Sequence, residues 1–184
     1  SSDLHLVFAP LPTSNPTLQS AMDTLAQLRM ASSPRVLWLS DWSARVVNAC
    51  QADVKAIAAY YTIFLAALRA LDDANVMQDT QVIYQSEAIL ADPSNYWISV
   101  INVGRHFSLQ RVMGDTMQDA DGVGQVIARL MQVADVVSLA PTTVAVLAAA
   151  KEEPQGLITE FIAQTLARSS AFNKPCNVDK SHGC

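Results

Sequence analysis

Short apolar segments that alternate with longer amphipathic ones constrain the fold of this chain more than any other feature. Residues 4–8 (LHLVF) and 36–40 (VLWLS) have the length of strands, and continuous apolar runs are typical of parallel strands that are covered on both faces. After the first run, Leu18, Met22 and Leu25 recur at helical spacing. The alternation predicts an α/β fold, with a parallel sheet and helices on both of its faces.

The remaining segments continue this alternation. Asp53 is the predicted N-cap of a long apolar helix, and Asp92 with Pro93 is predicted to start another. The predicted order is strand 4–8, a helix from 18, strand 36–40, a helix from 53, strand 81–84, helices over 86–113, helix 126–133, strand 134–139, a helix from 141 and helix 157–166.

The length of 184 residues suits one domain with a sizeable core. No repeat, low-complexity segment or linker divides residues 1–168, so we expect them to form that domain. Residues 169–184 are predicted to form a polar tail.

Composition excludes several classes of protein. Hydrophobic residues make up 51% of the chain and charged residues 16%, which excludes a disordered segment. The net charge of −5 argues against direct binding to DNA or another nucleic acid. The apolar runs 60–68 and 144–150 are too short to span a membrane. A mean hydropathy of +0.20 favours a buried interface with a partner.

The cysteines predict a reducing compartment. Cys50, Cys176 and Cys184 are odd in number and far apart, which argues against a disulfide framework. No secretory signal is visible, so we expect a cytoplasmic protein. Cys50 is expected to be a small buried residue. The three histidines and three cysteines lack metal-ligand spacing, so no metal site is predicted.

The loop after the first predicted strand, residues 9–16, occupies the place where a Rossmann-like sheet would bind a nucleotide. The loop contains no glycine, and three of its residues are proline. Phosphate binding at such a loop needs free backbone N–H groups, which proline lacks. Asn15 is the predicted cap of the following helix, with Pro16 in its first turn.

Several motifs resemble those of one known family. Residues 86–89 (SEAI), 92–97 (DPSNYW) and 103–112 (VGRHFSLQRV) follow the order of the family segments S-E-E-I, N-P-S-E-Y-W and A-R-K-F-N-L-P-R-I. Residues 130–136 (LMQVADV) are similar to L-M-Q-C-A-D-I, and residues 39–44 (LSDWSA) to I-A-D-W-F-A. Together they resemble the catalytic domain of eukaryotic-type tyrosyl-tRNA synthetases.

The resemblance covers roughly residues 4–150 and implies a Rossmann-like domain of a class I aminoacyl-tRNA synthetase. Such enzymes activate tyrosine with ATP and transfer it to tRNA, and they work as dimers in which one tRNA touches both subunits. The resemblance implies amino-acid binding for Gln132 and Asp135, which match the family motif. The alternative for both side chains is a structural hydrogen-bonding role.

Departures from the family pattern fall on its functional positions. The ATP-binding H-I-G-H motif aligns with residues 17–20 (TLQS), where Thr17 and Ser20 are expected to start a helix instead. Val7 and Ala128 stand where the family has tyrosines. Residues 178–181 (VDKS) are a candidate remnant of the K-M-S-K-S signature loop.

The resemblance and these losses together predict the non-catalytic half of a tyrosyl-tRNA synthetase. It would support a catalytic half, or a second copy, by dimer-like packing, and would meet tRNA only through the assembled enzyme. No cofactor is expected in this chain, whereas the family uses ATP and tyrosine. The alternatives are a divergent active ligase and an independent scaffold protein. The predicted interface residues are Tyr96, Trp97, Phe107 and Met131. For the first three, the alternative is a place in the core of this chain.

Overall fold

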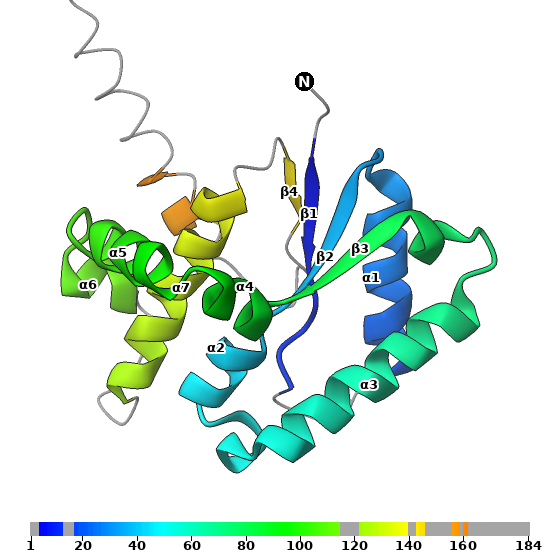
Figure 1. Cartoon of the computed structure of the whole chain (residues 1–184), viewed down its shortest axis with the longest axis horizontal. Helices are drawn as coiled ribbons and strands as arrows, with labels where there is room; N and C mark the ends of the chain where they lie inside the picture. The colour runs from blue at the N-terminus through cyan, green and yellow to red at the C-terminus, as the bar shows by residue number, and fades with distance from the viewer. Residues whose placement is uncertain are drawn as a thin grey trace, which may run out of the picture.

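Four parallel strands form the sheet of the computed structural model, in the order β3-β2-β1-β4 (Figure 1). The structure describes residues 4–12, 17–114, 122–139, 143–145, 156–158 and 160–161. The strands are β1 (His5–Phe8), β2 (Arg35–Leu39), β3 (Thr80–Tyr84) and β4 (Thr143–Ala145). The first three confirm the predicted strands.

Helices follow the strands along the chain. They are α1 (Leu18–Met30), α2 (Asp41–Val46), α3 (Val54–Leu71), α4 (Gln85–Ala91), α5 (Pro93–Gly104), α6 (Leu109–Met113) and α7 (Val123–Leu139), with 3-10 turns at Ala49–Ala52 and Val76–Asp79. Figure 1 shows α1 and α3 on one side of the sheet, with α5 and α7 on the other. The predicted α/β architecture with both faces covered is therefore confirmed.

Alternation along the strands divides the core in two, because successive strand side chains point to opposite faces. Val7 and Leu37 contribute to the core beneath α1 and α3. Leu6 and Trp38 contribute to the second core, which includes residues of α5 and α7. The buried Leu157 and Phe161 belong to the described part of the predicted last helix and join this second core.

Two predictions near the end of α7 are wrong. Residues 134–139, predicted as a strand, continue α7, and residues 143–145, predicted within a helix, form β4. Met131, Ala134 and Asp135 are all fully buried, which is the i, i+3, i+4 spacing of one helix face. β4 pairs in parallel with β1, and this long-range pairing decides the state of a segment whose local sequence permits either.

Short polar residues start α1, α3 and α5. The Asp53 side chain accepts a hydrogen bond from the backbone N–H of Lys55 (2.9 Å), and Asp92 accepts one from Asn95 (3.3 Å). Both predicted caps are confirmed. α1 begins at Leu18, and its N-cap is Thr17 rather than the predicted Asn15.

α3 is the one helix among the described residues that is long and apolar enough to cross a membrane by length and composition. In the structure, one face of this helix packs against the sheet. Tyr61, Phe64 and Leu68 are fully buried in the first core. A core helix therefore accounts for this apolar segment.

The turn between α2 and α3 has an uncommon backbone. Cys50, Gln51 and Ala52 have φ values of 51°, 57° and 57°, in the left-handed region that non-glycine residues seldom occupy. Cys50 is exposed, contrary to the prediction of a buried residue, and its thiol donates to the carbonyl of Pro12 (3.3 Å). This contact ties the turn to the loop after β1.

Gly124 lies in the first turn of α7. A Cβ atom at this position would lie 2.3 Å from the carbonyl oxygen of Val46 in α2. Only glycine therefore allows α7 to approach the end of α2 this closely.

Candidate functional site

The predicted site residue Asp135 is completely buried, and its carboxylate is bonded by side chains of this chain. The hydroxyl of Tyr96 donates to Oδ1 (2.7 Å). The side-chain amide of Gln85 donates to Oδ2 (2.7 Å), as does the indole N–H of Trp38 (3.1 Å). Both carboxylate oxygens are thus engaged without a ligand.

These four side chains come from four different elements. Trp38 lies on β2, Gln85 begins α4, Tyr96 lies on α5 and Asp135 lies on α7. Gln85 also accepts a hydrogen bond from the backbone N–H of Ser43 in α2 (2.8 Å). The cluster therefore links one strand and four helices on the second face of the sheet.

Burial and hydrogen bonding act on the Asp135 carboxyl group in opposite directions. Desolvation is the largest influence and raises its pKa, while the hydrogen bonds from Tyr96, Gln85 and Trp38 lower it. The net result is a pKa raised from 3.8 to about 7. Burial, followed by the nearby Asp135 charge, also raises the pKa of Tyr96, so Tyr96 keeps the proton that it donates.

The structure does not bring Gln132 into this cluster. Gln132 precedes Asp135 on α7 and is half-buried, and within the described part of the chain its side chain makes no hydrogen bond. Of the two residues assigned to amino-acid binding, only Asp135 therefore belongs to a polar network, and its partners are internal.

Gln85 and Trp38 are the members of the cluster that the sequence analysis missed. Gln85 directly follows the apolar strand β3, and Trp38 lies within the apolar strand β2. At such positions a side chain with an N–H donor is expected to find a buried acceptor. A polar glutamine directly after the apolar end of β3 was the available signal. Its partner, 50 residues further along the chain, could not be identified from sequence spacing.

Residues that align with functional motifs of the family make contacts within the chain instead. Thr17 Oγ1 accepts the backbone N–H of Ser20 (3.1 Å), which confirms its helix-start role, and Gln19 donates to Asp23 (2.8 Å). Arg129, on α7, donates to the carbonyl of Val112 (2.7 Å). In the described ranges, no group of three His, Cys, Asp or Glu side chains could hold a metal ion.

The four predicted interface residues differ in how far their side chains are exposed. Trp97 is 37% exposed, and its ring lies 6.5 Å from that of Trp42. Phe107 is half-buried against the second core. Tyr96 is only 6% exposed and Met131 is fully buried, so both contribute to the core of this chain.

Trp97 belongs to an exposed apolar face. Ile98 and Ile101 on α5 are 54% and 62% exposed, and Leu109 at the start of α6 is 63% exposed. Trp97, Ile98 and Ile101 have the i, i+1, i+4 spacing of one helix side. We call Trp97, Ile98 and Ile101 the α5 face.

Comparisons with known proteins identify the fold. No protein-family profile and no curated protein sequence matches the chain. Among solved structures, the tyrosyl-tRNA synthetase of Leishmania major in complex with tyrosinol matches with a TM-score of 0.73 and 22% identity, over 89% of this chain and 28% of that chain. The enzyme of Aeropyrum pernix matches with a TM-score of 0.74 and 19% identity, over 90% of this chain and 50% of that chain.

The chain has the fold of tyrosyl-tRNA synthetases. The enzyme of Archaeoglobus fulgidus, solved with L-tyrosine, agrees with a TM-score of 0.69 and 20% identity, over 91% of this chain and 51% of that chain. The chain therefore spans between 28% and 51% of the length of these three synthetases. The Rossmann-like fold implied by the resemblance is confirmed.

Proposed function

We propose that this chain is a non-catalytic tyrosyl-tRNA synthetase domain that supports a catalytic half by dimer-like packing. The main support is the saturated carboxylate of Asp135. At the position that the resemblance assigns to amino-acid binding, Tyr96, Gln85 and Trp38 use both oxygens. A ligand would have to displace these internal donors from a fully buried group.

The cost of that displacement is large compared with ordinary substrate affinity. A hydrogen bond to a charged group contributes about 1.5–3 kcal/mol, and 1.4 kcal/mol is a tenfold change in affinity. The loss of the family tyrosines at Val7 and Ala128 removes further contacts, since both positions carry small buried apolar side chains. We therefore expect neither tyrosine nor ATP to bind with micromolar affinity.

The α5 face is the proposed packing surface. Large exposed apolar side chains on one helix side favour association, and tryptophan is over-represented among the residues that dominate interfaces. Trp97 lies beside Trp42 and Tyr96, which hold its ring from within the chain (6.5 and 5.7 Å between ring centroids). In this proposal the partner half, in the cytoplasm, carries out tyrosine activation and tRNA contact is made by the assembled pair.

Calorimetry and sedimentation test the two parts separately. Titrating the full chain with tyrosine and with ATP is expected to give no micromolar dissociation constant, and such a constant for either ligand would overturn the non-catalytic assignment. Sedimentation of the chain alone and with a catalytic synthetase half from the same source is expected to show association.

A matched pair of variants locates the surface. Trp97→Ala should weaken that association by about 2 kcal/mol or more if Trp97 is central. Ile63→Ala, which removes a 57% exposed apolar side chain from α3 in the other layer, should leave it unchanged. If the two variants weakened association equally, the α5 face would be rejected as the packing surface.

A further inference from the structure

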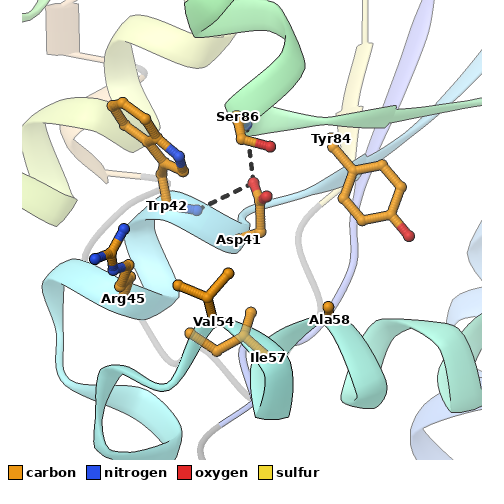
Figure 2. A pocket seen from close by; sticks show the side chains of 8 residues that line it. All are labelled: Asp41, Trp42, Arg45, Val54, Ile57, Ala58, Tyr84 and Ser86. Carbon is orange, nitrogen blue, oxygen red and sulfur yellow. Dashed lines mark hydrogen bonds between the residues drawn. The ribbon is translucent and has the colours of Figure 1, made fainter.

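A separate pocket of about 140 Å³ lies at the carboxyl ends of β2 and β3. Its lining comes from α2, the N-terminal part of α3, the last residue of β3 and the start of α4. Figure 2 shows Asp41 at its centre, with Val54 and Ile57 reaching toward it from α3 and the ring of Tyr84 on one side. The proposed loss of catalysis assigns no role to this pocket.

Asp41 presents a partly satisfied carboxylate to the pocket. Its Oδ1 accepts the backbone N–H groups of Ser86 (2.9 Å) and Trp42 (3.1 Å), which fix the side chain in place (Figure 2). Oδ2 has no hydrogen-bond or ion-pair partner among the described residues. An oriented carboxylate with one open oxygen is suited to an ammonium group.

Arg45 brings the opposite charge to the same pocket. It lies one helical turn after Asp41 and is exposed. Neither Arg45 nor Asp41 forms a salt bridge within the described part of the chain, although both line the pocket. Two unpaired charges of opposite sign, held one turn apart, are complementary to a ligand that carries both charges.

The rest of the pocket is apolar. Ile57 is buried and forms the floor, whereas Val54 is 55% exposed and borders the opening. Tyr84 and Trp42 add aromatic walls. An apolar cavity of about 150 Å³ accommodates benzene, so this volume suits a ligand of about eight non-hydrogen atoms.

We propose that this pocket binds a small free α-amino acid with a branched aliphatic side chain. The ammonium group binds Asp41 Oδ2 beside the Tyr84 ring, the carboxylate binds the Arg45 guanidinium, and the aliphatic group packs on Val54 and Ile57. Each polar end of the ligand meets one charged side chain of the opposite sign. The site is independent of Asp135 and of the α5 face.

The test uses L-valine as the probe, with NMR detection of the Trp42 and Ser86 backbone amides of the full chain. These amides donate to Asp41, so occupation of the pocket should shift both resonances. We expect saturable binding with a dissociation constant of about 1 mM. Isobutylamine and isovalerate are valine without its carboxylate and without its ammonium group, respectively, and both should bind at least about tenfold more weakly.

Variants assign the two ends of the ligand. Arg45→Gln, at an exposed position, should weaken valine binding about tenfold or more and leave isobutylamine unaffected, and Asp41→Asn should abolish the response to both amines. Arg105→Gln, an exposed arginine outside the pocket, should change nothing. If Asp41→Asn fails to fold, Arg45→Gln and the two half-probes still decide the question.

Two results would overturn the proposal. One is the absence of a saturable shift of both amides at about ten times the expected dissociation constant. The other is equal affinity for valine and isobutylamine, which would remove the role of Arg45. Neither result bears on tyrosine binding or on association through Trp97.

Discussion

The hydroxyl of Tyr96 donates a 2.7 Å hydrogen bond to Oδ1 of Asp135 and thereby joins α5 to α7 inside the second core. Tyr96 is 6% exposed and Asp135 is fully buried, so water cannot replace either partner. A carboxylate at a position matching a substrate-binding motif is thus part of the internal packing of this chain.

Asp135→Ala should destabilise the fold by at least about 3 kcal/mol, because it leaves the donors of Tyr96, Gln85 and Trp38 buried without an acceptor. Urea unfolding measures this loss. Gln132→Ala, three residues earlier on the same helix, is the control and should stay within about 0.5 kcal/mol of the parent. Similar losses for the two variants would show that the network contributes nothing particular to stability.

Stability should fall as pH rises from about 4 to about 7. The pKa of Asp135 is about 7 in the folded chain, against 3.8 for the free side chain. Between these pH values the folded state binds more protons than the unfolded state. The contribution of protonated Asp135 to the free energy of unfolding is therefore complete below about pH 4 and is lost as the pH rises through about 7. The change amounts to about 4 kcal/mol at most, since one pKa unit corresponds to about 1.4 kcal/mol.

Urea unfolding at a series of pH values measures this slope, and Asp135→Asn serves as its control. The amide cannot ionise, so the variant should show a flatter profile over the same range. A parent chain that becomes more stable toward pH 7, with a flat Asp135→Asn profile, would show that the hydrogen bonds outweigh burial.

Gly124→Ala should destabilise the chain by about 1–3 kcal/mol, because the new methyl group would overlap the carbonyl of Val46 and push α7 away from α2. Gly122→Ala is a matched control two residues earlier, where a Cβ atom would meet nothing within 4 Å. Thermal unfolding compares the two. Equal midpoints of thermal unfolding for the two variants would mean that α7 can move away from α2 without loss of stability.

Restoring the two histidines of the ATP motif should not restore catalysis. Thr17→His with Ser20→His rebuilds that signature, but Val7 and Ala128 still offer apolar side chains where the family holds tyrosine. Catalytic groups act as a unit, so a partial rebuild yields little. Tyrosine-dependent ATP–pyrophosphate exchange measures the outcome against the parent chain. Exchange clearly above the parent would favour a divergent active ligase.

Local sequence alone determined most of the framework. The apolar runs that became β1, β2 and β3 are short and bounded by loop residues, and capping residues such as Asp53 and Asp92 act over only a few positions. Because these signals are local, they could be interpreted without knowing the fold. The motif order extended these local signals to the correct fold, although the three synthetases compared above are only 19% to 22% identical to this chain.

Only the tertiary structure decided the role of each site residue. Asp135 becomes internal because its partner Trp38 lies 97 residues away, and Met131 becomes a core residue because its side of α7 faces the sheet. The C-terminal half of α7 and the strand β4 were also decided by packing, through helix burial and pairing with β1. Sequence spacing carries no information on such long-range contacts, because they form only when distant segments meet across the sheet.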